Sequence, residues 1–225
     1  MKFLYFRDRC DAGRRLAAEL QQVTLNDPII LGLPRGGIPV AYEVASALHA
    51  PLDVMVVRKL GAPFQPELAI GAIASGNVRV INEDLVASIW GLDESVIDEI
   101  AARESVELER RERLYRGDRP MPNLEQRDVV LVDDGLATGA TMRAAVEAVR
   151  ARQPSKIIVA VPTGSEDAVR SIGRISDRVI CLDTPAFFHA VGQSYRRFDQ
   201  TTDEEVRELL ESAARLREPG SPAGY

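Results

Sequence analysis

Two adjacent carboxylates follow an apolar run within residues 129–141, VVLVDDGLATGAT. Asp133 and Asp134 come after four apolar residues, and residues 137–141 then lead into a helical pattern. A helix N-terminus offers unpaired N–H donors to a phosphate, and Gly139 lets the backbone approach the anion closely. A phosphate would repel two carboxylates unless these bind hydroxyl groups. The vicinal hydroxyls of a ribose 5-phosphate satisfy both observations, so this segment predicts a sugar-phosphate site.

Cationic residues follow two other apolar runs. Arg35, Gly36 and Gly37 come after the run at residues 28–33, and Arg58 and Lys59 come after the run at residues 52–57. An Arg-Gly-Gly turn often serves only as a helix cap, and a cation at a strand end is often there for solvation. The chain has three lysines among 28 cationic residues, and one of them is Lys59. A compact ammonium group in an arginine-rich chain favours a specific role for that residue.

The segment 129–141 resembles the 5-phosphoribosyl-1-pyrophosphate (PRPP) signature of the type I phosphoribosyltransferases, which consists of an apolar strand, an acidic pair and a T-G-x-T loop. The resemblance implies that Asp133 and Asp134 bind the 2′- and 3′-hydroxyls of ribose. It implies that a backbone loop cradles the 5′-phosphate, and this loop consists of Ala137, Thr138, Gly139, Ala140 and Thr141. It also implies that pyrophosphate is bound by Arg35, Gly36, Gly37, Arg58 and Lys59. In this family a cis peptide is frequent in the pyrophosphate loop, and the bond between Pro34 and Arg35 is the candidate here.

The same resemblance implies an enzyme, a pentosyltransferase that moves the 5-phosphoribosyl group of PRPP to a nitrogenous base or related acceptor and releases pyrophosphate. Mg²⁺ would be the cofactor, carried mainly by PRPP and lying near the acidic pair. Arg35 and Lys59 would join it in stabilising the leaving group. Members that act on 6-oxopurines often have a carboxylate at the position of Ala137. Either Glu67 or another group therefore acts as the acid or base, or the acceptor is not a 6-oxopurine.

The acceptor-binding residues are expected near the C-terminus. Residues 187–198, FFHAVGQSYRRF, resemble the segment with which hypoxanthine-type members cover the base. Phe187, Phe188 and Val191 are the candidates for contact with a flat heterocycle, although the two phenylalanines could equally belong to the core. The ATGAT loop is closer to adenine- and orotate-type members, so the identity of the acceptor stays open.

The elements that must position these residues alternate along the chain. Continuously apolar runs predict strands buried on both faces, at residues 28–33, 52–57, 128–132, 156–161 and 178–182. Helical patterns lie between several of them, at residues 38–49, 140–152 and 165–172. This order predicts an α/β fold with an open, mostly parallel sheet and helices on both faces. Ligands of such sheets bind beyond the carboxyl ends of the strands, where the candidate residues stand.

Three further segments complete the predicted architecture. Residues 69–82 predict two short strands joined at 75–77, and residues 93–115 predict a long helical insertion. Arg110, Arg111 and Arg116 of that insertion could reach a polyphosphate, although a surface helix carries similar arginines. Beyond a small C-terminal hood, Thr202 and Glu205 form a capping-box pattern for a last helix that runs to about residue 217. We expect a single domain over residues 1–217 and a disordered tail at 218–225.

Composition narrows the function classes. The chain has 225 residues, of which 45% are hydrophobic and 28% are charged, and its net charge is −6. These values exclude an intrinsically disordered chain and argue against a general binder of nucleic acid or anionic membranes. Cys10 and Cys181 are far apart and form no metal-binding pattern, and a cytoplasmic location is expected. The alternative to an enzyme is a non-catalytic regulatory module that binds PRPP or a nucleotide, and a homodimer is possible by analogy with the family.

Overall fold

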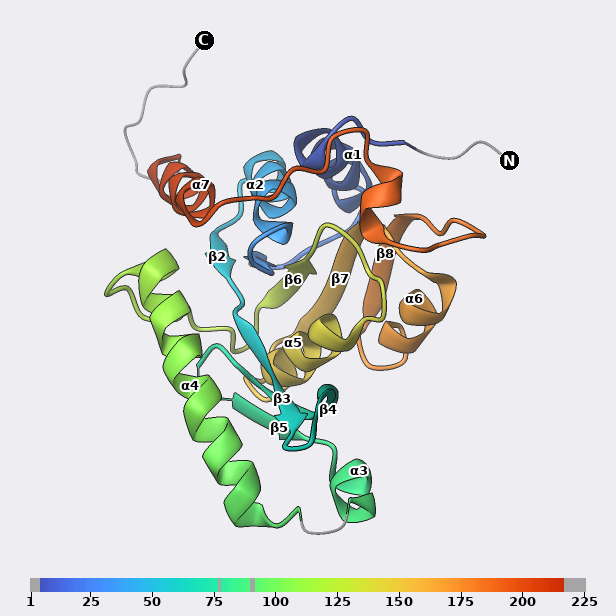
Figure 1. Cartoon of the computed structure of the whole chain (residues 1–225). Helices are drawn as coiled ribbons and strands as arrows, with labels where there is room; N and C mark the ends of the chain where they lie inside the picture. Colours follow the sequence, from blue (N-terminus) through green and yellow to red (C-terminus); the bar gives the residue numbers. More distant parts are fainter. Residues whose placement is uncertain (1–4, 77, 90–91, 217–225) are drawn as a thin grey trace.

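The computed structural model describes residues 5–76, 78–89 and 92–216. Its main body is a five-stranded parallel sheet in the order β2-β1-β6-β7-β8 (Figure 1). The strands are β1 (Ile29–Gly32), β2 (Leu52–Val54), β6 (Asp128–Val132), β7 (Lys156–Thr163) and β8 (Arg178–Asp183). The predicted α/β fold with an open, mostly parallel sheet is therefore confirmed.

Helices cover both faces of this sheet. They are α1 (Arg9–Leu20) and α2 (Gly37–Leu48) on one face, and α5 (Ala140–Arg150) and α6 (Glu166–Ile172) on the other. Successive side chains of a strand point to opposite faces. Ile30 and Val130 accordingly pack against α1 and α2, whereas Leu31 and Leu131 pack against α5 and α6. Burial on both sides explains why the strands read as unbroken apolar runs.

Helix α1 lies in a segment for which the sequence interpretation predicts no element. Asp8 caps it by accepting a hydrogen bond from the backbone N–H of Asp11 at 2.9 Å. Ala12, Leu16 and Leu20 recur at intervals of four and are fully buried: Leu16 and Leu20 pack against α2 and the sheet, and Ala12 packs against Phe6 and Tyr195. The cap and this spacing were the available signal, and three charged residues between the apolar residues, Arg14, Arg15 and Glu19, obscured it.

A second, antiparallel sheet in the order β3-β4-β5 lies beside the first. Its strands are β3 (Val57–Ala62), β4 (Gln65–Ala74) and β5 (Val78–Ile81). The predicted strand at 52–57 is wrong in its extent, because β2 ends at Val54 and the chain then changes sheets. At the crossing, Met55 donates its N–H to the carbonyl of Gly32 in β1, whereas Val56 donates to the buried hydroxyl of Ser75 beyond β4. The strand pair predicted at 69–82 is confirmed, and residue 77 of its turn lies outside the described residues.

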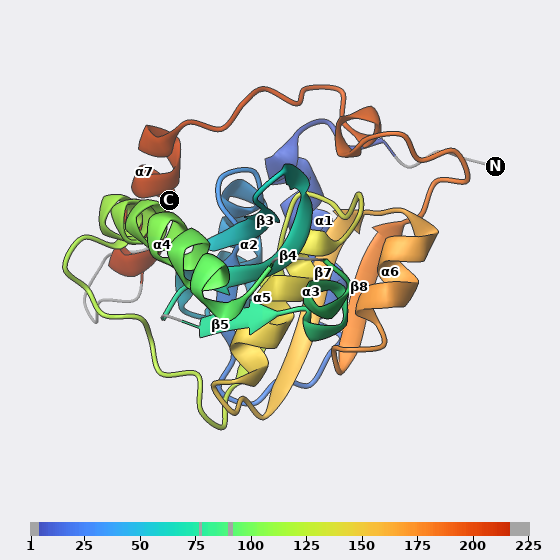
Figure 2. The same cartoon turned by 60° about the horizontal axis from the view of Figure 1, so that its bottom comes forward.

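The second sheet is covered by the predicted long helix. Helix α4 (Glu94–Arg116) runs along it in Figures 1 and 2, and buries Ile100 and Leu108 against Leu60 and Ile70. The remaining helices are α3 (Glu83–Ser88), the 3₁₀ turn η1 (Val191–Ser194) and α7 (Asp203–Arg215). Helix α7 joins the same apolar cluster as α4. It begins at its Thr202 cap as predicted, and the tail predicted at 218–225 lies outside the described residues.

A buried ion pair fastens the end of α4 to the main sheet. The guanidinium of Arg116, whose side chain is 5% exposed, lies 3.1 Å from the carboxylate of Asp53 in β2 and also pairs with Glu112. Arg116 is thus unavailable to a polyphosphate, which corrects one of the possibilities raised by the sequence. Arg110 and Arg111 both pair with Glu107 on the same helix. Among the described residues, no helix has the length and apolar character needed to cross a membrane.

Candidate active site

Asp133 and Asp134 lie directly beyond β6, at the carboxyl edge of the parallel sheet. Oδ1 of Asp133 accepts a hydrogen bond from the backbone N–H of Asp134 at 2.8 Å, and Oδ2 of Asp134 accepts one from Nε of Arg9 at 2.8 Å. Burial raises the pKa of both carboxyls, and the charge of Asp134 raises that of Asp133 further. Arg9 opposes the rise in the pKa of Asp134. Hydroxyl donors or a cation placed against this pair would relieve the cost of burying two negative charges.

The loop that follows the acidic pair has the features of an anion cradle. Gly139 is the N-cap of α5 and has a φ of +75°, a conformation that favours glycine. The N-cap Gly139 has no side chain to cap α5, and the hydroxyl of Thr138 accepts a long hydrogen bond from the N–H of Ala140 at 3.4 Å. The next N–H groups of the first turn are available to a ligand. The carbonyl of Ala137 is held by the hydroxyl of Ser165 at 2.7 Å, which fixes the loop against the segment that follows β7. Thr138 and Thr141 are exposed beside these donors.

The loop between β1 and α2 packs directly against the acidic pair. The peptide bond between Pro34 and Arg35 is cis, as the family resemblance implies. A Cβ added at Gly36 would lie 2.0 Å from Oδ2 of Asp134, and one added at Gly37 would lie 2.9 Å from the Cα of Asp133. Both positions therefore require glycine. The structure thus brings the predicted pyrophosphate loop and the predicted sugar site together.

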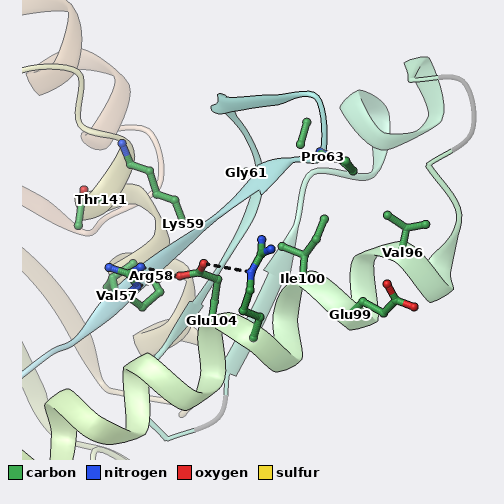
Figure 3. Close-up of a pocket in the computed structure, with 12 residues that line it drawn as sticks. Val57, Arg58, Lys59, Gly61, Pro63, Val96, Glu99, Ile100, Glu104 and Thr141 are labelled. Atoms are coloured by element: carbon green, nitrogen blue, oxygen red, sulfur yellow. Dashed lines mark hydrogen bonds and ion pairs between the residues drawn. The ribbon is translucent and has the colours of Figure 1, made fainter.

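The two cations predicted at a strand end, Arg58 and Lys59, instead lie within β3, and their side chains point to opposite faces of it. Arg58 donates to Oε2 of Glu104 in α4 at 2.9 Å from Nε and 2.6 Å from Nη2. The exposed side chain of Lys59 extends toward Thr141 of the phosphate loop (Figure 3). Neighbouring residues of a strand point to opposite faces, so only one of the two can reach the phosphate loop directly. Lys59 is that residue, and Arg58 is engaged in an ion pair with the helical insertion.

Two cavities flank Lys59. One of about 740 Å³ lies between β3 and α4, with Thr141 at its edge (Figure 3). The other, of about 660 Å³, lies between the β4–β5 pair and α5, with Thr138 and Ala140 at its edge. The second sheet therefore leaves space on both sides of the phosphate loop. A cation at Lys59 borders both spaces.

Arg35 is the third predicted cation. Its side chain is partly exposed and lies 3.9 Å from the carboxylate of Asp203, the first residue of α7. Asp203 also accepts a hydrogen bond from the phenol of Tyr115 at the end of α4. The last helix and the helical insertion thus meet beside the glycine loop. A long, partly exposed ion pair of this kind leaves Arg35 able to turn toward an anionic ligand.

Comparison with known proteins agrees with this geometry. A sequence model of the phosphoribosyl transferase domain matches residues 6–192. The chain belongs to the phosphoribosyl transferase domain family. It is 43% identical to TT1426 from Thermus thermophilus, whose crystal structure superposes with a TM-score of 0.85 over 92% of this chain and 98% of that one.

Two curated relatives come from strains of Mycobacterium tuberculosis and are named phosphoribosyl transferases on a provisional basis. Each is 51% identical to this chain over 210 residues, which is 93% of this chain and 47% of the relative. The chain thus spans about half the length of the curated relatives it matches.

The C-terminal segment lies beside the family's signature loop. A Cβ added at Gly135 would meet the side chain of Val191 at 2.6 Å, so Val191 sits against the residue that follows the acidic pair. The phenol of Tyr195 donates to the carbonyl of Asp134 at 2.6 Å. Phe187 is 75% exposed, which excludes it from the core, and Phe188 is partly buried. Of the three predicted base-contacting residues, Val191 is the one that the structure places next to the signature loop.

Two residues bear on which group acts as the acid or base, Ala137 and Glu67. Ala137 is exposed in the loop that follows the acidic pair, and its methyl group cannot exchange a proton. Glu67 belongs to β4, and its side chain lies outside the described part of the structure.

Three site residues were missed by sequence reasoning. Arg9 and Tyr195 hold Asp134 from opposite ends of the chain, and Glu104 holds Arg58. The cap and apolar spacing of α1 could have revealed the helix that carries Arg9. No sequence signal indicates any of the three pairings, because each joins residues more than 40 positions apart.

Proposed function

We propose that the protein is a PRPP-dependent phosphoribosyltransferase that transfers the 5-phosphoribosyl group to a nitrogenous base or related acceptor and releases pyrophosphate. The observation that carries the proposal is the contact between Gly36 and the carboxylate of Asp134, where no Cβ would fit. Through this contact, a glycine loop suited to bind pyrophosphate lies directly against an acidic pair suited to bind ribose. The backbone cradle at the start of α5 stands on the other side of that pair and suits the 5′-phosphate.

In the reaction, the bond between C1′ of the sugar and the pyrophosphate oxygen breaks, and the electron pair leaves with pyrophosphate. A nitrogen of the acceptor forms the new bond to C1′ and gives up a proton. Arg35 and Lys59 supply positive charge for the leaving group, and the carboxylates of Asp133 and Asp134 fix the sugar through its hydroxyls. Glu67 remains our candidate for the group that takes the proton.

Mg²⁺ fits this site. Burial and the neighbouring charge of Asp134 both raise the pKa of Asp133, so a nearby cation would stabilise these two partly buried carboxylates. Within the described ranges, no cluster of three or more His, Cys, Asp or Glu side chains is arranged to hold a metal ion. We propose that Mg²⁺ arrives on the oxygens of PRPP and lies near Asp133 and Asp134. Bound there, the ion would neutralise charge on pyrophosphate.

The experiment measures binding and turnover separately. Calorimetric titration with PRPP and Mg²⁺ should show binding, and a screen of nitrogenous bases should then find one that triggers pyrophosphate release. The double substitution Asp133→Asn with Asp134→Asn should abolish binding while the circular dichroism spectrum stays unchanged. Lys59→Ala should lower the turnover number more than the affinity for PRPP.

The regulatory alternative gives a different outcome. A module that only senses PRPP would bind it and release no pyrophosphate with any acceptor, and Lys59→Ala would then change affinity alone. Failure of the wild-type protein to bind PRPP would overturn both functions.

A further inference from the structure

Arg9, in the first turn of α1, makes a two-point contact with the acidic pair. Its Nε and Nη2 atoms both lie 2.8 Å from Oδ2 of Asp134. The two side chains are 12% and 14% exposed, so this ion pair is largely removed from solvent. Both contacts fall on one carboxylate oxygen, which leaves Oδ1 as the oxygen available to a ligand. A fixed guanidinium thereby sets the rotation of the Asp134 carboxylate.

The C-terminal segment holds Arg9 in place. Nη1 of Arg9 donates to the carbonyl of Asp199 at 2.6 Å, and its guanidinium lies 3.9 Å from the ring centroid of Phe198. Phe198 packs against Tyr195, whose phenol donates to the carbonyl of Asp134. The acidic residue is thus held at its side chain by α1 and at its backbone by the C-terminal segment. Guanidinium–aromatic contacts and hydrogen bonds of this kind leave Arg9 a single orientation.

The contact has an electrostatic consequence. Burial raises the pKa of Asp134 and so disfavours a second negative charge beside Asp133. The positive charge of Arg9 opposes this rise in the pKa of Asp134. The titratable groups around Asp134 are Arg9 from α1, Asp133 beside it and Tyr195 from the C-terminal segment. A largely buried carboxylate that has lost the guanidinium paired with it would be a poorer acceptor for sugar hydroxyls.

We propose that Arg9 is a positioning residue, which orients Asp134 toward the sugar of PRPP and is itself held by the segment from Tyr195 to Asp199. The inference rests on the proposed function, because it assumes that the acidic pair binds ribose. It gives α1 and the C-terminal segment from Tyr195 to Asp199 a part in substrate binding. The sugar site is then complete only when α1 and the C-terminal segment are both in place.

The test compares ligands that contain ribose with one that lacks it. Arg9→Met should weaken binding of PRPP and of ribose 5-phosphate roughly 10- to 100-fold, the loss expected when a hydrogen-bonded charge is removed. Inorganic pyrophosphate should bind with unchanged affinity, because Arg35 and the glycine loop remain intact. Arg9→Lys keeps the charge with fewer donors and should recover part of the loss. Arg14→Met, on the same helix in a half-exposed pair with Glu43, is the matched control and should bind all three ligands normally.

The outcomes distinguish failure of the proposed function from failure of the inference about Arg9. Wild-type protein that fails to bind PRPP overturns the proposed function and this inference together. Wild-type protein that binds PRPP, with an Arg9→Met variant that binds it equally well, overturns only the inference. Equal losses for PRPP and pyrophosphate in Arg9→Met would show a general structural role and overturn it as well. If Arg9→Met does not fold, Arg9→Lys and Phe198→Leu serve instead, and both should weaken ribose 5-phosphate binding selectively.

Discussion

The position of the acidic pair depends on two glycines packed against it, Gly36 and Gly37, which lack a Cβ atom. Gly36 and Gly37 let the loop after β1 lie against Asp133 and Asp134, at distances that no other residue type would allow. The positions of the two carboxylates are therefore set by backbone packing as much as by their own hydrogen bonds. At this scale the site is sensitive to the addition of one methyl group.

Gly36→Ala tests this sensitivity. The new Cβ would displace the carboxylate of Asp134, so we expect PRPP affinity to fall roughly a hundredfold, as misplacement by about 1 Å can do. Calorimetry measures the affinity, and circular dichroism checks that the fold is retained. Gly173→Ala is the control, since a Cβ there meets nothing closer than 3.3 Å. Normal PRPP binding by Gly36→Ala would contradict the assigned geometry.

Cys181 gives a second prediction for a single residue. Burial raises the pKa of its thiol to about 11, and its Sγ donates to the carbonyl of Asp183. Because the thiolate is the reactive form, Cys181 at pH 8 should react with a disulfide reagent about a hundredfold more slowly than in the urea-unfolded chain. The Cys10→Ala variant isolates this thiol for the measurement. Equal rates in the folded and unfolded states would show that the partly buried thiol of Cys181 in β8 is not shielded as its raised pKa implies.

The second sheet and α4 form the element that carries Lys59 toward the phosphate loop. Two ion pairs fasten them: Arg58 with Glu104 joins β3 to α4, and Arg116 with Asp53 joins the end of α4 to β2. The second pair is the more deeply buried. Removing Arg116 would take the ion-pair partner from the carboxylate of Asp53, whose pKa burial already raises, and would leave it the hydrogen bond from the N–H of Val54.

Arg116→Met should lower the free energy of unfolding by about 3–5 kcal/mol at pH 7, the usual cost of breaking a buried ion pair. The pKa of Asp53 is already raised by burial and should rise further without Arg116. A carboxyl whose pKa is higher in the folded than in the unfolded state takes up a proton preferentially when folded. The deficit of the variant relative to wild type should therefore shrink as pH falls from 7 to 5.

Urea unfolding at several pH values measures this deficit. The exposed Arg113→Met variant is the control and should change stability by less than about 0.5 kcal/mol. A deficit for Arg116→Met that does not depend on pH would contradict the role assigned to Asp53.

Elements whose signal is local were predicted from the sequence, and those defined by distant partners were not. The strand, acidic pair and glycine-containing loop at residues 129–141 are contiguous, and the structure has them in the predicted order. The 52–57 run looks like one strand because nothing local marks the place where Met55 bonds to β1 and Val56 to Ser75. The partners of Arg9 and Arg58 depend on α1 and α4 packing against other elements, which periodicity does not reveal.

At the scale of the whole molecule, the N-terminal segment that carries Phe6 and Arg9 meets the C-terminal segment around Tyr195 beside the acidic pair. Phe6 bridges to Tyr195 and exchanges backbone hydrogen bonds with Ser194 and Arg196. The site thus draws on α1, both sheets and the C-terminal segment. A ligand held there would contact several of these parts at once and should stabilise them together.

PRPP with Mg²⁺ should therefore raise the midpoint of thermal unfolding. At a concentration 100 times its dissociation constant, a ligand specific for the folded state adds about 2.7 kcal/mol of stability. For a chain of this length, each kcal/mol raises the midpoint by roughly 2–4 °C, which calorimetry or a dye-based melt detects readily. The Asp133→Asn, Asp134→Asn double variant should melt at the same temperature with and without PRPP. A shift retained in that variant would place the ligand elsewhere.

The change of sheets at Met55 and Val56 has a consequence for how such a protein can diversify. Everything from β3 to α4 is inserted in the chain between β2 and β6, two strands of the parallel sheet that lie on either side of β1. The phosphate cradle and the acidic pair belong to the parallel sheet, while the cavities beside Lys59 are walled largely by the insert. Substitutions in the insert can therefore change the walls of these cavities while the acidic pair and the loop after it stay unchanged, so the insert is the segment to randomise in laboratory evolution.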